Sequence, residues 1–476
     1  MTWGSFLSRS LSLIIVLPLI LTRLSTEEIS LWYLFSTVIG LQRLVDLGFS
    51  PTFSRVIAFG MGGLNTSELK DVNNPKQYSS SNAPNWETIE KIFSTMKAVY
   101  LRLTGISILL LISLGTLALI KPISAVPNTF SAWTAWGVIL IVSTATIIGN
   151  VYNAYLQGVN QIALLRRWEM LFSLGAIGTS FIVLLFDGGL LELVVANQIW
   201  LLLNILRNRW LCKIINNKKF SNFEFQYQDI DPLVFEAVWS SAWRSGLGSF
   251  MNYGLVQISG IIYAQFGSAS VVASYLLSLR FIQVVNQFAQ APFYSKLPTL
   301  AKLYSSGKLK QQVMIAHRGM KIAYWSFIFG FISIGIFASP ILDLIDSNAK
   351  FANPLLWSLM GLGVFAERYG AMHMHFYSIT NHIIWHIANG YTGVIYLLVS
   401  LILFNKIGIY AFPLGTLVSN LGFYCWYSAM HSYKAFNLKF WKFERSAMII
   451  PLTLILMYCL GSVMYFIFKM EFSIFL

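Results

Sequence analysis

The stretch LQRLVDLGFSPTFSRVIAF, residues 41–59, places charged and helix-bending residues inside a long apolar run. It holds two arginines, Arg43 and Arg55, together with Asp46 and Pro51. A helix needs about 20 apolar residues to cross the hydrocarbon layer, and a charge at its centre costs roughly 2.5–3.5 kcal/mol on insertion scales. The stretch therefore indicates a membrane helix whose charged side chains face a polar interior or a partner.

The composition of the whole chain is that of a membrane protein. Of its 476 residues, 56% are hydrophobic and 11% are charged, whereas a soluble domain carries about 25% charged residues. The three cysteines, Cys212, Cys425 and Cys459, have neither paired nor metal-ligand spacing. We therefore expect no disulfide framework, no metal site and no cofactor.

Thirteen apolar segments are long enough to be membrane helices. If the amino terminus is cytoplasmic, the cytoplasmic connections hold 21 Lys and Arg residues and the opposite connections and tail hold five. Positive charge gathers on the cytoplasmic side, so this asymmetry predicts that orientation and explains the net charge of +14 without nucleic-acid binding. The predicted spans are 3–22, 29–59, 98–120, 130–156, 169–186, 190–206, 238–266, 270–295, 322–342, 354–377, 383–404, 408–431 and 447–468.

An internal repeat appears when the chain is shifted by 241 residues. Pro51 then lies on Pro292, and a Pro-x-aromatic-Ser-basic signature ends both the second and the eighth span. Parallel repeats are typical of transporters that bind cargo between two halves, although one aligned patch could arise by chance. We predict an all-α polytopic membrane protein of two pseudo-symmetric six-helix bundles, with twelve core helices and an extra carboxyl-terminal helix, and expect Pro51 and Pro292 to act as hinges.

The repeat predicts four regions along the chain. They are a first bundle at 1–207 that contains a cytoplasmic loop at 62–97, a cytoplasmic linker at 208–237, a second bundle at 238–431, and a loop with the extra helix at 432–476.

Seven arginines and no lysine lie within the predicted spans. Guanidinium groups match phosphate with two parallel hydrogen bonds, so a cavity that they line favours an anionic cargo. Some of them lie near cytoplasmic helix ends, where the alternative is that the side chain reaches the lipid headgroups. The arginines are Arg9, Arg43, Arg55, Arg102, Arg244, Arg280 and Arg368, of which Arg43, Arg280 and Arg368 are nearest to mid-span.

Two acidic residues and a polar stripe accompany these arginines. Asp46 lies three residues after Arg43, so an ion pair within one helix is an alternative to a functional role. Glu367 and Asp46 are candidates for a counter-charge or for coupling to Na⁺ or H⁺. The polar residues that we expect to face the same cavity are Gln42, Gln283, Asn286, Gln287 and Gln290.

The motifs LPLILTRLSTEE at 17–28 and LVDLGFSPTFSR at 44–55 resemble those of bacterial polysaccharide-export flippases. These are the O-antigen and repeat-unit translocases of the multidrug/oligosaccharidyl-lipid/polysaccharide superfamily. The resemblance implies a MATE-like fold, a cationic central lumen and alternating access. It also implies that an oligosaccharide linked to undecaprenyl pyrophosphate moves from the cytoplasmic to the periplasmic leaflet of the inner membrane, with other polysaccharide-assembly membrane proteins as partners.

Two other functions are compatible with a polytopic helical chain. A multidrug or cation antiporter of the same architecture would need buried carboxylates, and only Asp46 and Glu367 lie deep within the spans. A membrane polymerase or glycosyltransferase of the same pathway would need a large catalytic segment outside the membrane, which the predicted connections lack. The sequence therefore favours a transporter over an enzyme.

Overall fold

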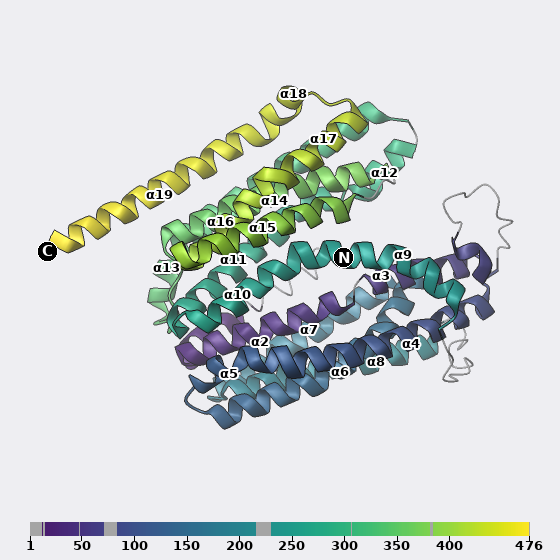
Figure 1. Cartoon of the computed structure of the whole chain (residues 1–476), viewed down its shortest axis with the longest axis horizontal. Coiled ribbons are helices and arrows are strands. Elements are labelled where there is room, and N and C mark those ends of the chain that lie inside the picture. The colour runs from purple at the N-terminus through teal and green to yellow at the C-terminus, as the bar shows by residue number, and fades with distance from the viewer. Residues whose placement is uncertain are drawn as a thin grey trace. The chain divides into compact units, whose positions relative to one another are not determined.

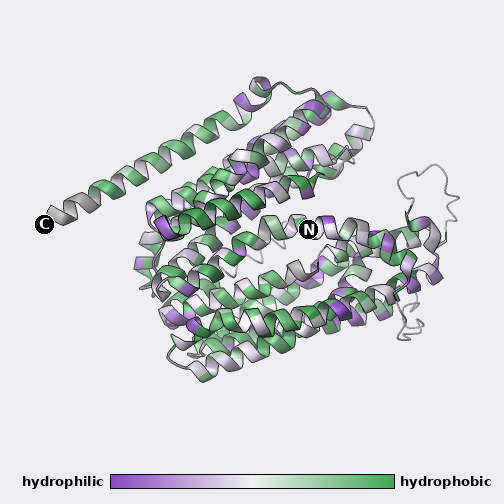
Figure 2. Cartoon of the chain, in the orientation of Figure 1, coloured by the Kyte–Doolittle hydropathy of each residue, from purple (hydrophilic) through white to green (hydrophobic). Residues whose placement is uncertain are grey.

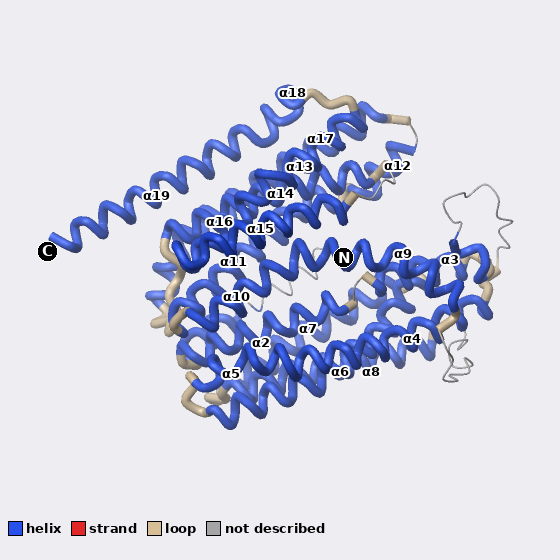
Figure 3. Tube along the Cα trace, viewed as in Figure 1, coloured by secondary structure: helices blue, strands red, loops and turns tan. Residues whose placement is uncertain are grey.

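The computed structural model describes residues 12, 15–46, 48–70, 83–215, 230–305, 307–380 and 384–475. Every regular element within these ranges is a helix (Figure 3). The chain forms two compact units, Met1–Ser249 and Phe250–Leu476.

The first unit is built around one long central helix, α6 (Thr129–Gly158), which packs against α3, α4 and α8. Gly149 allows α8 to approach α6 closely, because a Cβ at this position would lie 2.8 Å from the side chain of Ile205 on α8. After helical residues 15–23, the other elements are α2 (Thr26–Val45), α3 (Phe49–Met61), η1 (Thr66–Lys70), α4 (Trp86–Leu110), η2 (Leu111–Gly115), α5 (Thr116–Ser124), α7 (Ile162–Leu185), α8 (Leu190–Ile214) and α9 (Pro232–Ser249) (Figure 1).

The second unit is built around α14 (Pro354–Ser378), which packs against α11, α13, α16, α17 and α19. The other elements are η4 (Phe250–Gly254), α10 (Leu255–Phe266), α11 (Ala269–Tyr294), α12 (Leu297–Ser305), α13 (Leu309–Leu344), α15 (Trp385–Ile407), η5 (Gly408–Tyr410), α16 (Ala411–Ser419), η6 (Asn420–Tyr424), α17 (Cys425–Phe436), α18 (Phe440–Glu444), η7 (Arg445–Ile449) and α19 (Ile450–Phe475).

The helices carry the apolar surface that a membrane requires. Eight helical stretches in the described residues are long and apolar enough to cross a bilayer, and Figure 2 shows hydrophobic residues along most of their length. Phe329 on α13 and Leu401 on α15 are 77% and 68% exposed, as expected for side chains that face lipid. One stretch, Trp385–Phe436, joins the predicted eleventh and twelfth spans.

Each of the thirteen predicted spans overlaps helix where the structure describes it, although the second is interrupted after Val45 and not all thirteen meet the criteria of length and apolarity. Of the first span, only residues 12 and 15–22 are described. Helix α14 is not among the eight apolar stretches, and it carries Glu367, Arg368 and His373. These polar and charged residues lower the mean hydropathy of α14, although they are the residues through which a membrane helix can take part in function.

The predicted second span is broken rather than bent. Helix α2 ends at Val45 and α3 begins at Phe49, because Gly48 adopts the left-handed conformation with φ of 73°. Pro51 lies in the first turn of α3, where its missing N–H costs no helical hydrogen bond. The expectation that Pro51 bends a continuous helix is therefore corrected: the break is at Gly48.

The repeat partner of this segment behaves differently. Helix α11 continues without a break to Tyr294 and contains Pro292 in its last turn. The repeat places Ala289 opposite Gly48, and alanine does not favour the left-handed conformation. It also places Gln287 opposite Asp46, whose carboxylate accepts a hydrogen bond from the Ser50 N–H at 3.0 Å and so caps α3.

The division between the units also differs from the predicted one. The predicted second bundle starts at residue 238, whereas α9, which ends at Ser249, packs on α3, η1 and α4 of the first unit. The boundary falls within one uninterrupted helical run, at the start of the π-helical turn η4.

A buried polar network fixes α18 to the helices of the second unit. Glu444 Oε1 accepts a hydrogen bond from the Tyr433 hydroxyl at 2.7 Å and lies 2.9 Å from His373 Nε2. The Tyr433 hydroxyl is also 2.9 Å from that of Tyr369. Glu444 and His373 are both fully buried, so the centre of the network that joins α14, α17 and α18 is out of contact with solvent.

We predict that Gly48→Ala destabilises the first unit strongly. The new Cβ would require an unfavourable φ and would lie 2.6 Å from Ser245 Cβ and 2.9 Å from the Ala242 carbonyl oxygen. The matched control is Gly307→Ala, which has φ of 69° but no atom within 4 Å of the new Cβ. Thermal unfolding in detergent should show a loss of about 1–2 kcal/mol for the control, from backbone strain alone, and a larger loss for Gly48→Ala. Equal losses would contradict the close packing at Gly48.

We predict that Glu444→Ala destabilises the second unit by roughly 1–3 kcal/mol or more, because His373 and Tyr433 would keep their buried polar atoms without this partner. Asp343→Ala on the exposed face of α13 is the control, and we expect it to change the unfolding midpoint little. An unchanged midpoint for Glu444→Ala would show that the network does not hold α18 in place.

Candidate functional site

The candidate site is a polar cluster between α14 and α11 in the second unit, centred on Arg368. The Arg368 side chain is only 2% exposed. Its Nε donates a hydrogen bond to Asn286 Oδ1 at 2.8 Å, and its Nη1 donates to the Tyr294 hydroxyl at 3.2 Å. The guanidinium carbon also lies 5.6 Å from the centre of the Tyr294 ring, in a cation–π contact. Helix α11 therefore surrounds a buried cation that α14 supplies.

Asn286 connects this cation to an acidic residue. Its carbonyl oxygen accepts from Arg368, and its amide nitrogen donates to Glu367 Oε2 at 3.3 Å. Glu367 and Arg368 are adjacent on α14 and point in directions about 100° apart. They form no ion pair with each other or with any other residue of the described ranges. One amide thus bridges a guanidinium and a carboxyl group that do not contact each other directly.

Among the described residues, the acceptors that hold Arg368 are all neutral. Asn286 and Tyr294 provide the short contacts, and Gln290 Oε1 lies at the limiting distance of 3.5 Å from Nη1. The guanidinium donor is charged, so these bonds are already stronger than bonds between two neutral groups, and a phosphate would add a full opposite charge and the geometry for two parallel hydrogen bonds. An anionic ligand could therefore replace the neutral acceptors around this guanidinium at a favourable energy.

An aromatic wall closes the cluster at the carboxyl-terminal end of α14. The Tyr294 ring lies 4.2 Å from the ring of His375, centroid to centroid. His375 in turn lies 4.4 Å from Trp385 of α15 in an edge-to-face arrangement. These flat surfaces border the charged groups, and aromatic rings of this kind can also pack against sugar rings.

The structure brings together four of the residues predicted from sequence: Arg368, Glu367, Asn286 and Gln290. The remaining members of the α11 stripe, Gln283 and Gln287, are half-buried on the same helix. Tyr294 was not predicted, although it lies eight residues after Asn286 and thus on the same helical face. That spacing is the signal that would have identified it.

The other predicted arginines take different positions. Arg280 is exposed on α11, and Arg55, Arg102 and Arg244 are exposed on α3, α4 and α9 of the first unit. Arg244 lies over the ring of its neighbour Trp243, at 5.7 Å from the centroid. Of the whole predicted set, Arg368 is the one arginine that the described side chains show to be buried.

Three predicted residues lie outside the described part of the structure. Arg9 is not described at all, and the side chains of Gln42 and Arg43 on α2 are not described. Their predicted roles therefore stay predictions.

Asp46 has a structural role in the first unit. The carboxylate accepts a short hydrogen bond from the Tyr100 hydroxyl on α4, in addition to the Ser50 N–H. It therefore links α4 to the break between α2 and α3.

In the described residues, no group of three or more His, Cys, Asp and Glu side chains is arranged to hold a metal ion.

Sequence comparisons identify no relatives of this chain. No family model matches it. No curated protein sequence matches it either.

Solved structures, by contrast, share its fold. The inward-closed structure of the lipid II flippase MurJ matches with a TM-score of 0.63 and 11% identity, over 99% of each chain. An inward-facing multidrug resistance MATE family transporter of the MOP superfamily matches with a TM-score of 0.62 and 12% identity, over 88% of this chain and 93% of the other. A mutant of the Vibrio cholerae MATE transporter VcmN matches with a TM-score of 0.52 and 16% identity, over 92% of this chain and 99% of the other. The chain is thus a multi-pass membrane protein with the fold of the MOP-superfamily transporters.

Proposed function

We propose that this protein is a flippase for lipid-linked oligosaccharides. Its cargo would be a repeat unit of O-antigen or another surface polysaccharide on undecaprenyl pyrophosphate, moved from the cytoplasmic to the periplasmic leaflet by alternating access. The observation that carries the proposal is the buried guanidinium of Arg368, which is held by neutral acceptors in the part of the chain that the structure describes. The fold supports it, because one of the structures that share it is that of a lipid II flippase.

The chemistry of the cluster suits a pyrophosphate. Phosphate oxygens would compete with Asn286 and Tyr294 for the Arg368 N–H groups, and each new bond would be charge-assisted. Asn286 would then keep its bond to Glu367, so that the cluster has two arrangements, one with cargo and one without. Cargo can change the conformation of a transporter only if it binds one of two states more tightly than the other. The two arrangements of this cluster would provide such a pair of states.

The site also has a means of releasing the cargo. In the empty state, Asn286 and Tyr294 satisfy the same N–H groups that the phosphate would use. The free energy of binding is therefore the difference between two sets of hydrogen bonds, which keeps the affinity moderate. A transporter needs this property, because cargo must leave on the opposite side.

A cation antiporter of the same architecture is the second candidate. Glu367 lies in the cluster and accepts a hydrogen bond from Asn286, and two of the solved structures with this fold are MATE transporters. A cationic cargo would need this carboxylate as its partner, and Arg368, its neighbour on α14, would repel such a cargo. The buried arginine therefore favours the anionic cargo.

A loss-of-function strain tests the proposed function. If the protein is a flippase, cells that lack it should accumulate complete, unpolymerised lipid-linked repeat units on the cytoplasmic face of the membrane. Their sidedness can be measured by lectin or chemical labelling of inverted and right-side-out vesicles. Accumulation on the periplasmic face would indicate a polymerase, and unchanged lipid intermediates with greater sensitivity to cationic drugs would indicate the antiporter.

We predict that Arg368→Lys lowers translocation by roughly 10- to 100-fold, because it keeps the charge but loses the planar fork that contacts two acceptors. Transport of labelled lipid-linked repeat units into the outer leaflet of proteoliposomes measures the rate. Lys310→Gln on the exposed start of α13 is the control and should leave the rate unchanged.

Because Arg368 is buried, a substitution there could also reduce folding. Arg280→Ala, on the exposed face of α11, tests another of the arginines predicted to bind the cargo without removing a buried charge. Both variants should slow transport, and Arg280→Ala should do so with an unfolding midpoint near that of the unmodified protein. Full transport activity in both would remove these arginines from the mechanism.

A further inference from the structure

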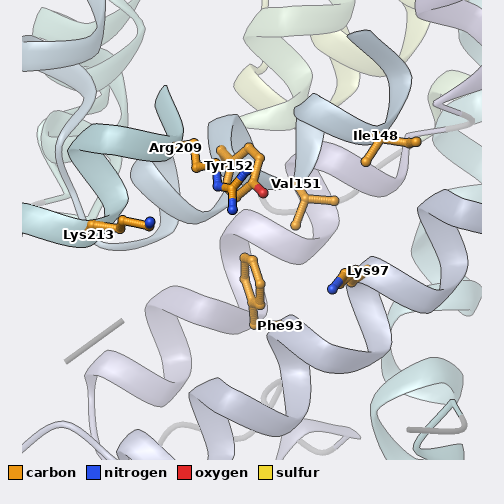
Figure 4. A pocket seen from close by; sticks show the side chains of 7 residues that line it. All are labelled: Phe93, Lys97, Ile148, Val151, Tyr152, Arg209 and Lys213. Atoms are coloured by element: carbon orange, nitrogen blue, oxygen red, sulfur yellow. The ribbon is translucent and has the colours of Figure 1, made fainter. Parts of the chain in front are cut away.

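A second cationic site lies wholly within the first unit. Lys97 of α4 and two residues of α8, Arg209 and Lys213, line a cavity of about 100 Å³. In Figure 4 the charged ends of these three side chains point toward the same space, which lies between Tyr152 and Phe93. None of these residues belongs to the cluster around Arg368.

The helices of the first unit hold these three basic side chains close together. Arg209 and Lys213 are four residues apart on α8, so they lie on one helical face and repel each other. Helix α8 packs closely on α6 at Gly149, and the Cys212 thiol donates to the Tyr152 carbonyl at 3.6 Å. The cations are thus carried on helices that pack rigidly together, rather than on a connecting loop.

The size and lining of the cavity limit the ligand. A pocket for a drug-sized molecule has roughly 300–1,000 Å³, so a cavity of about 100 Å³ admits a single small group and not an oligosaccharide. Its remaining walls, Ile148 and Val151, are apolar. Among the described residues that line it there are three cations and no Asp or Glu. This combination fits one phosphate group with an apolar extension beside it.

The position of the cavity identifies the source of that phosphate. Lys97 directly precedes the predicted third span, Tyr152 lies in the last turns of the fourth, and Arg209 and Lys213 follow the sixth. All four therefore lie at the same end of the unit, which the distribution of basic residues predicts to be cytoplasmic. Anionic lipid headgroups occupy this level of the inner leaflet, and basic pockets between membrane helices are known to bind them.

We infer that this cavity binds the phosphate of an anionic phospholipid headgroup. The three cations contact the phosphate oxygens, Tyr152 and Phe93 border the glycerol, and the acyl chains remain in the bilayer. The site does not depend on what the protein transports. It anchors one end of the first unit at the cytoplasmic surface, in membranes that contain anionic lipid.

The experiment measures lipid binding to the full-length protein in detergent by native mass spectrometry, with phosphatidylglycerol and phosphatidylcholine as probes. The triple variant Lys97→Gln, Arg209→Gln, Lys213→Gln should lose phosphatidylglycerol affinity on the order of 100-fold, since each basic residue near an anionic headgroup contributes about fivefold. Phosphatidylcholine binding should not change.

The matched control removes the same charges elsewhere. Lys308→Gln, Lys310→Gln, Arg318→Gln also replaces two exposed lysines and one exposed arginine, at the start of α13, and should leave the affinity within about twofold, as expected for charges that do not touch the ligand. Equal losses in both triple variants would mean that net charge alone attracts the lipid, which overturns the proposal. The unfolding midpoints of both variants are measured in parallel, and Lys213→Gln alone serves if the triple variant unfolds.

A second arm distinguishes a lipid from a free phosphate. Inorganic phosphate and glycerol 3-phosphate are titrated into the protein by isothermal calorimetry. If these soluble ions bind with the same dependence on the three residues while phosphatidylglycerol does not bind, the assignment to a lipid is wrong. Absence of binding in both arms also overturns it.

Discussion

The contact between Arg368 and Asn286 is the constraint on which the second unit depends most. A guanidinium that is 2% exposed must have its N–H groups satisfied by protein. Asn286 and Tyr294 on α11 meet this requirement from two positions on one helical face. The need to satisfy one buried cation thus sets how α11 lies against α14, the helix on which the rest of the unit packs.

Much of this arrangement could be predicted from the sequence. The apolar segments identify the helices, and the charge of Arg368 within an apolar segment marks it as a residue that needs a partner. The polar spacing on residues 283–290 identifies the partner helix. The link between Glu444 and His373 could not be predicted, because the two lie 71 residues apart, and neither periodicity nor spacing connects a short helix after one span to the carboxyl-terminal part of another.

The break at Gly48 shows a second limit of sequence reasoning. In a sequence, proline indicates a bent membrane helix more strongly than glycine does, so the bend was predicted at Pro51. The conformation depends instead on Gly48, which alone can adopt φ of 73° without strain, and on the Asp46 carboxylate, which caps the new helix. Pro51 does not disrupt α3 because it lies in the first turn of that helix. This position could be known only after the break at Gly48 had been located.

The two cationic sites differ in a way that follows from their surroundings. Around Arg368 the acceptors are neutral, directional and supplied by the protein, so the guanidinium is preorganised and a ligand must displace existing bonds. Around Lys97, Arg209 and Lys213 the cations are exposed and surround a small cavity, so a ligand gains mainly by Coulomb attraction. The first type of site favours geometric selection and reversible exchange, as transport requires. The second favours retention of a small anion at the membrane surface, where the bilayer supplies that anion at high local concentration.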